Sequence, residues 1–185
     1  AASLTVSSTS NLLGTSGAWT QTSGQLVLTA ASGGTASGTA CVVTFDLTNT
    51  ATAQTSPAVS VAAAIEDGSS GSVGSIASAA MTKPGTALYG VANGADPLTV
   101  EVPTFSLKSI QQSTPVSGAT NTLTVSLTAN FALATGSTVT ITGLTGSQTA
   151  DSASLGVRTS GGALGTSGEW TQSTGQLVLT SAGMV

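Results

Sequence analysis

The sequence predicts an all-β protein: an antiparallel β-sandwich whose module boundaries are out of phase with the ends of the chain. Three observations support this. Apolar and hydroxyl-bearing residues alternate with a period of two through most of the chain. Clusters of Ser, Gly, Asn and Pro separate the alternating segments. A segment of 34 residues occurs twice. The frequent Thr and Val residues are stiff at χ1 and therefore favour the pleated conformation.

The alternation is clearest at residues 122–128 and 138–142, where every second residue is Leu, Val or Ile and is expected to face the core. In residues 41–48, Cys41 alternates with other inward positions, so a buried structural thiol is predicted. The only helix-tolerant stretch is 76–81. Strands this close together in sequence indicate a sandwich. Further strands are expected at 3–7, 25–30, 41–48, 58–65, 98–102, 104–110, 153–158 and 176–180.

The repeat relates residues 1–34 to residues 152–185 without gaps at an offset of 151, and 19 of the 34 aligned pairs are identical. A period of this length suits one domain with its linker and is too long for one coil of a solenoid. Trp19 and Trp170 are predicted to be repeat anchors, either as packing residues or as platforms that stack on sugars. The densest match reads Leu13-Gly-Thr-Ser-Gly-Ala-Trp19-Thr-Gln21 against Leu164-Gly-Thr-Ser-Gly-Glu-Trp170-Thr-Gln172.

The repeat also suggests how the module is divided. Residues 103–185 are predicted to be the first strands of a sandwich, and residues 1–65 its later strands. Residues 66–102 form a connector rich in Gly, Ser and Ala that carries a short strand. Segments 103–151 and 1–65 would already supply one set of strands, so 152–185 is a spare copy.

The spare copy suggests a mechanism of assembly. An apolar strand within it is predicted to complete a neighbour's sandwich, which gives open head-to-tail chains. The alternatives are a window of a covalent tandem array and a closed monomer of two related halves. The predicted assembly strand consists of Gln176, Leu177, Val178, Leu179 and Thr180.

Composition predicts an extracellular protein. The chain has 3 basic and 7 acidic residues, and only 5% of its residues are charged, whereas ordinary soluble proteins have roughly 25%. Ser and Thr together make up 61 of the 185 residues. A surface rich in hydroxyls suits a secreted protein that carries sugars, although an unmodified extracellular domain would also fit. No Asn lies in an N-glycosylation sequon, so any glycan would be O-linked. Candidate acceptors, chosen because a following Pro favours an extended and accessible backbone, are Thr50, Thr52, Thr55, Ser56, Ser113 and Thr114.

The sequence does not predict an enzyme. The chain has no His and a single Cys, which argues against zinc sites and Ser-His-Asp catalysis. The adjacent acids Glu66 and Asp67 are expected to be a solvated loop, so neither a metal nor a cofactor is expected. The three cations are scattered, which argues against nucleic acid. No apolar run is long enough to span a membrane. Flat arrays of Thr hydroxyls for ice or polysaccharide binding are a rival to plain solvent-facing strands.

The segments Asn121-Thr-Leu-Thr-Val-Ser-Leu-Thr128 and Gly136-Ser-Thr-Val-Thr-Ile-Thr-Gly-Leu-Thr-Gly-Ser-Gln148, together with the repeated Leu-Gly-Thr-Ser-Gly-x-Trp-Thr-Gln, resemble tandem Ig-like modules. Such modules occur in large, low-charge surface proteins of algae and protists. The chain also resembles protomers of glycosylated extracellular filaments. The resemblance implies secretion, O-glycosylation and fibre or coat assembly, with the chain itself as partner, and brings no catalytic motif. The expected function is a structural module of an extracellular fibre or surface coat; the alternative is a carbohydrate-binding adhesin module of a cell-surface array.

Overall fold

The computed structural model describes residues 1–31, 33–69 and 71–183. Its regular structure is almost entirely antiparallel strand, so the prediction of an all-β fold is confirmed. The face-to-face packing of an Ig-like sandwich stays a prediction. Two short 3-10 turns, Thr9–Asn11 and Ser160–Gly162, accompany the strands. The strands are β1 (Ala2–Ser8), β2 (Ser16–Thr20), β3 (Gln25–Val27), β4 (Val43–Phe45), β5 (Ser60–Glu66), β6 (Ser72–Ala80), β7 (Phe105–Gln112), β8 (Leu123–Ala129), β9 (Thr138–Ile141), β10 (Ser152–Gly156), β11 (Ser167–Thr171) and β12 (Gln176–Thr180).

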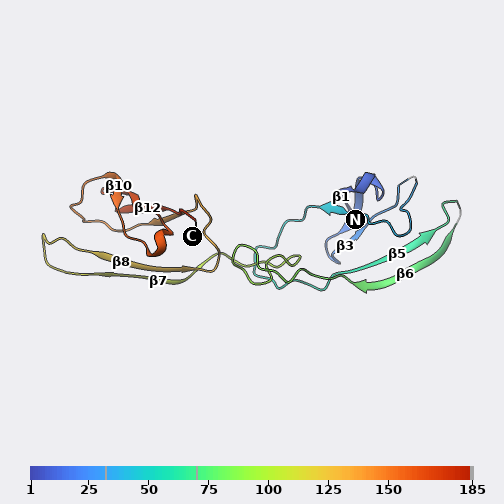
Figure 1. The fold of residues 1–185 in the computed structure, drawn as a ribbon, viewed down its shortest axis with the longest axis horizontal. Coiled ribbons are helices and arrows are strands. Elements are labelled where there is room, and N and C mark those ends of the chain that lie inside the picture. The colour runs from blue at the N-terminus through green and yellow to red at the C-terminus, as the bar shows by residue number, and fades with distance from the viewer. Residues whose placement is uncertain (32, 70, 184–185) are drawn as a thin grey trace. The chain divides into compact units, whose positions relative to one another are not determined.

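The chain divides into two units, Ala1–Thr50 and Ala51–Val185. The first unit, drawn in blue in Figure 1, holds a four-stranded sheet with the strand order β3-β2-β1-β4. The second unit holds a four-stranded sheet with the order β10-β11-β12-β9. It also holds two antiparallel hairpins, β5–β6 in green and β7–β8 in yellow (Figure 1). Each four-stranded sheet therefore contains one copy of the repeat plus one strand from outside it.

The two copies of the repeat share local structure as well as sequence. The Ser8 hydroxyl donates a hydrogen bond to the Gly14 carbonyl at 3.2 Å, and Thr159, its counterpart, donates to the Gly165 carbonyl at 2.7 Å. The turn after β1 places Ser10 in the left-handed region with a φ of 49°, and the second copy has Gly161 there with a φ of 61°. The fold imposes this backbone geometry even where the residue is not glycine.

A buried glycine in each copy shows why the repeat keeps its pattern of small and large residues. A Cβ added at Gly17 would lie 2.6 Å from Leu28 Cδ2 and 2.7 Å from Leu26 Cδ1. A Cβ at Gly168, the counterpart of Gly17, would meet two leucines of β12 at 2.7 and 2.9 Å. The leucine side chains of the hairpin partner cross directly over the glycine, so no larger residue fits without displacing them.

Several strand predictions need correction. The strands β2 and β11 lie in the repeat motif itself, and β6 includes most of the stretch expected to tolerate a helix. The strand predicted at 41–48 is only β4, where Phe45 is 43% exposed, and Cys41 is half-buried rather than buried. In β8, Leu123 is exposed although its alternation predicted burial. Alternation identifies one face of a strand but does not show whether another layer covers that face.

The core of the described residues is small. Its buried apolar side chains are Val6, Val139, Trp170 and Leu179. Large apolar side chains are exposed elsewhere, among them Val61 of β5, Ile76 of β6 and Leu107 of β7.

Candidate assembly surfaces

The predicted assembly strand, residues 176–180, does not present a free edge. This strand, β12, pairs with β11 on one side and with β9 on the other, with Leu177 opposite Ile141 and Leu179 opposite Val139. Leu179 is only 6% exposed. The prediction of an unpaired edge here is wrong because residues 138–141 of the same chain supply the neighbouring strand. Within the described residues, β12 therefore offers no vacant side to a strand from another copy.

The segment that follows β9 covers the tryptophan of the second copy. The Trp170 indole Nε1 donates a hydrogen bond to the Thr149 carbonyl at 2.9 Å, and the ring is 5% exposed. Two residues later, Gln172 Nε2 donates to the Ser147 carbonyl at 2.9 Å, and its backbone N–H donates to Asp151 Oδ1 at 2.6 Å. β9 and residues 144–151 thus form a cover over one edge of the second copy.

The first copy has the same side chains without that cover. Trp19 is half-buried, and Val27 is 50% exposed where its counterpart Val178 is half-buried. The β3 strand pairs with β2 on one side, and within the described residues no strand pairs with its other side. This free side, which we call the β3 edge and define as residues 25–28, corresponds to the side of β12 that β9 occupies.

At the other side of the repeat, the first copy has a neighbouring strand that the second copy lacks. In the first copy, β4 pairs with the end of β1, with Val6 opposite Phe45 and Ser8 opposite Val43. This pairing leaves Val6 only 4% exposed. In the second copy, β10 ends before the counterpart Val157, which is half-buried, and no strand among the described residues pairs with residues 157–159. We call residues 157–159 the β10 edge.

Both hairpins carry exposed apolar side chains. Ile65 of β5 is 44% exposed and Ile76 of β6 is 59% exposed, while Leu107 and Ile110 of β7 are exposed to a similar degree. An isolated two-stranded hairpin is marginally stable in water, so these ribbons gain from a further layer against their apolar faces.

The predicted glycan acceptors differ in accessibility. Thr50, Thr52, Thr55 and Ser113 lie in exposed positions, and Thr114 is half-buried. The Ser56 hydroxyl oxygen is buried and has no hydrogen-bond partner among the residues that the structure describes. Ser56 is therefore unsuited to glycosylation in the folded chain, because a transferase cannot reach this oxygen. The Pro at position 57 suggested an open backbone, but a proline says nothing about what covers the preceding side chain.

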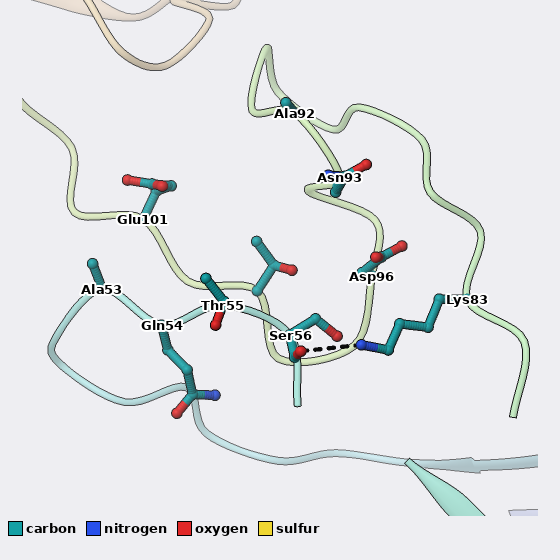
Figure 2. A pocket seen from close by; sticks show the side chains of 10 residues that line it. Ala53, Gln54, Thr55, Ser56, Lys83, Ala92, Asn93, Asp96 and Glu101 are labelled. Atoms are coloured by element: carbon teal, nitrogen blue, oxygen red, sulfur yellow. Dashed lines mark hydrogen bonds between the residues drawn. The ribbon is translucent and has the colours of Figure 1, made fainter. Parts of the chain in front are cut away.

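The buried Ser56 belongs to a hollow of about 440 Å³ between residues 53–56 and residues 83–101 (Figure 2). Lys83 Nζ donates a hydrogen bond to the Ser56 carbonyl at 3.0 Å, which Figure 2 shows as a dashed line. The Asp96 carboxylate is held on one wall because it accepts the Gly85 N–H at 2.7 Å. Eight of its ten lining residues carry a polar side chain, and none of them is aromatic. The predicted strand at 98–102 appears here only as a single bridge between Gln54 and Val100.

The structure and the comparisons add few further constraints. Among the described residues, no group of acidic, Cys or His side chains is arranged to hold a metal ion. None of the described helices has the length and apolar character needed to cross a membrane. No protein-family model, curated protein or solved structure matches the chain.

Proposed function

We propose that the protein is a non-enzymatic structural module of an extracellular fibre or surface coat, in which the period of 151 residues repeats head to tail. One observation carries the proposal. Among the described residues no strand pairs with the free side of β3, and this β3 edge contains no charge and no proline. An unprotected sheet edge of this kind invites the addition of a strand from another copy.

The composition supports an extracellular setting for this assembly. A surface with 5% charged residues has little electrostatic repulsion to keep copies apart. O-linked glycans on the exposed Thr50, Thr52, Thr55 and Ser113 would supply the hydration that charges supply elsewhere, and would keep assembly confined to unglycosylated faces.

Electron microscopy of the native material tests the proposal directly. We expect regular filaments or sheets whose axial repeat corresponds to one folded period. Sedimentation of the purified chain at increasing concentration should show a growing series of species, because a heterologous contact does not close. Monodisperse monomers at all concentrations, together with native material that lacks any repeat, would refute the structural role.

A second candidate function is carbohydrate binding by an adhesin module. The hollow in Figure 2 favours it, because carboxylate, amide and hydroxyl groups line it together. A glycan array with the isolated protein tests this candidate, with Asn93→Ala and Glu101→Ala as variants that alter the lining. Saturable binding that both variants weaken would support the adhesin; a blank array would exclude it for the glycans displayed.

A further inference from the structure

The two copies of the repeat allow the same sheet edge to be compared with and without a neighbouring strand. The copies share 19 of 34 residues, yet each has a neighbouring strand that the other lacks. β9 covers the second copy at β12, and β4 covers the first copy at β1. Each copy thus shows what fits the vacant edge of the other.

We infer that the β3 edge binds a strand with the sequence of β9, and the β10 edge binds a strand with the sequence of β4, each supplied by a second copy of this 151-residue period. The complete sheet then has five strands: a β9 strand, the three strands of the repeat, and a β4 strand. This inference rests on the proposed function and names the contacts through which the module repeats.

The residues of the first copy retain the groups that β9 and its following segment use. Trp19 and Gln21 repeat the pair Trp170 and Gln172, whose side-chain N–H groups bond the carbonyls of residues 149 and 147. Among the described residues, neither the Trp19 indole N–H nor the Gln21 amide donates a hydrogen bond. Both side-chain N–H groups can therefore donate to the carbonyls of residues 149 and 147 of a second copy.

The glycine before the β3 edge also fits an incoming strand. Gly24 has a φ of 62°, and a Cβ added there would have no atom within 4 Å. Its counterpart Gly175 has a φ of 61°, and a Cβ added there would meet backbone atoms of Leu144 and Thr145 at 2.5 Å. In the second copy the segment after β9 lies against this glycine, and the Leu144 N–H donates to the Gly175 carbonyl at 3.0 Å. The first copy keeps the glycine, with its left-handed turn, where that segment would lie.

At the other edge, β4 shows what the β10 edge accepts. The Thr9 N–H donates to the Val42 carbonyl at 2.9 Å, and the Val42 N–H donates to Thr9 Oγ1 at 2.9 Å. Ser160 replaces Thr9 in the second copy and keeps the hydroxyl. Thr159 in the β10 edge has an extended backbone, and the adjacent Ser160 supplies the hydroxyl acceptor that Thr9 offers to the segment before β4 in the first copy.

The first experiment adds a synthetic peptide of residues 133–151 to the full chain carrying Trp170→Phe, in which Trp19 is the sole tryptophan. We expect a saturable blue shift of Trp19 emission toward the emission maximum of Trp170 in the Trp19→Phe variant. The matched control peptide carries Val139→Asp and Ile141→Asp and should cause no shift. In the Trp19→Phe variant the intact peptide should leave Trp170 emission unchanged, because that edge already holds its own β9.

Hydrogen exchange measured on the unsubstituted chain tests the same binding without relying on the tryptophan variants. The intact peptide should slow exchange of alternate amides of residues 25–28 by roughly tenfold or more, since only every second N–H of a strand points at one neighbour. For the β10 edge, a second copy of residues 35–50 appended after Val185 keeps the offset of 151 and should slow exchange at residues 157–159 by a similar factor.

The outcomes separate this inference from the proposed function. Unchanged Trp19 emission and unchanged exchange at residues 25–28 under saturating peptide would overturn the assignment of the β3 edge, even if native filaments are found. Peptide binding together with native material that is monomeric would leave the edge assignment standing and overturn the fibre. If the peptide shifted the emission of Trp170 and not that of Trp19, the peptide would have replaced β9 beside β12. This result would also contradict the inference.

Discussion

Replacing the two repeat tryptophans one at a time tests whether the cover formed by β9 and residues 144–151 determines the stability of each copy. Trp170 is 5% exposed and donates to the Thr149 carbonyl at 2.9 Å. Truncating a fully packed Trp to Ala costs about 3–5 kcal/mol, through lost burial and the cavity that remains. Trp19 occupies the same place in the repeat but is only half-buried, so Trp19→Ala should cost about half as much, on the order of 1.5–2.5 kcal/mol.

Native-state hydrogen exchange is the appropriate assay, because it reports the opening free energy of each sheet separately. Amides of β11 and β12 report on the second copy, and amides of β2 and β3 on the first. Because a loss of about 4 kcal/mol approaches the whole stability of a small sheet, Trp170→Phe serves as a milder variant that keeps an aromatic ring but removes the indole N–H. Its expected cost is about 1–2 kcal/mol. Equal losses for the two alanine variants, or a larger loss for Trp19→Ala, would refute the reasoning.

Further variants use the same internal comparison. Gly24→Ala and Gly175→Ala share the cost of a left-handed alanine, but Gly175→Ala should lose about 1–3 kcal/mol more, because its Cβ meets backbone 2.5 Å away; equal losses in urea denaturation would contradict this. Ser10→Gly, which copies the second repeat at a φ of 49°, should stabilise the first unit by about 1 kcal/mol in the same assay. Ser181→Ala should cost about 1 kcal/mol or more in hydrogen exchange at β12, because it removes the donor to the Leu133 carbonyl. Intact-mass measurement of the native protein should exceed the bare chain's 17.7 kDa by whole hexose or N-acetylhexosamine units, and an unmodified mass would reject O-glycosylation.

The sequence was a good guide to the position of a strand where the strand has a long alternating pattern. The strand predicted at residues 138–142 matches the bounds of β9 to within one residue, and the expected burial of Val139 is confirmed. The alternation at residues 122–128 likewise locates β8. In these segments local propensity and the hydrophobic pattern agree, so the strand forms where the pattern predicts it.

The alternating pattern did not predict β2 and β11, because each of these strands begins with Ser and Gly. Gly17 and Gly168 carry no side chain that could alternate, and their role appears only when the leucines that cross over them are seen. The repeat itself was the usable signal: a motif retained twice, ending in Trp and followed by a strand, points to a second strand of the same hairpin.

The error at residues 176–180 has a different origin. Sequence identity between two copies suggested that they compete for one position in a sandwich. In the structure each copy forms its own sheet, and the copies differ in which outside strand joins them. Pairing between distant strands depends on which segments the chain brings together, and a local pattern carries no information about that choice.

The proposed assembly at the free edges would also explain why so few residues of the chain are charged. Natural proteins protect exposed sheet edges with lysines, prolines or bulges, which block addition of a further strand. The β3 edge reads Gln25-Leu-Val-Leu28 and contains no charge and no proline, whereas the β10 edge contains one charged residue, Arg158. A monomer that had to remain alone would be under pressure to block both. An edge that is regularly occupied needs no such block, and a chain whose edges are occupied by its own repeat can dispense with charged residues elsewhere, provided that sugars hydrate the faces left outside. In the proposed assembly, low charge, hydroxyl-rich loops and an unblocked β3 edge would be three consequences of one arrangement. A variant with Val27→Lys, at a side chain that is 50% exposed, in the Trp170→Phe background should remain monomeric, and its Trp19 emission should no longer respond to the peptide of residues 133–151.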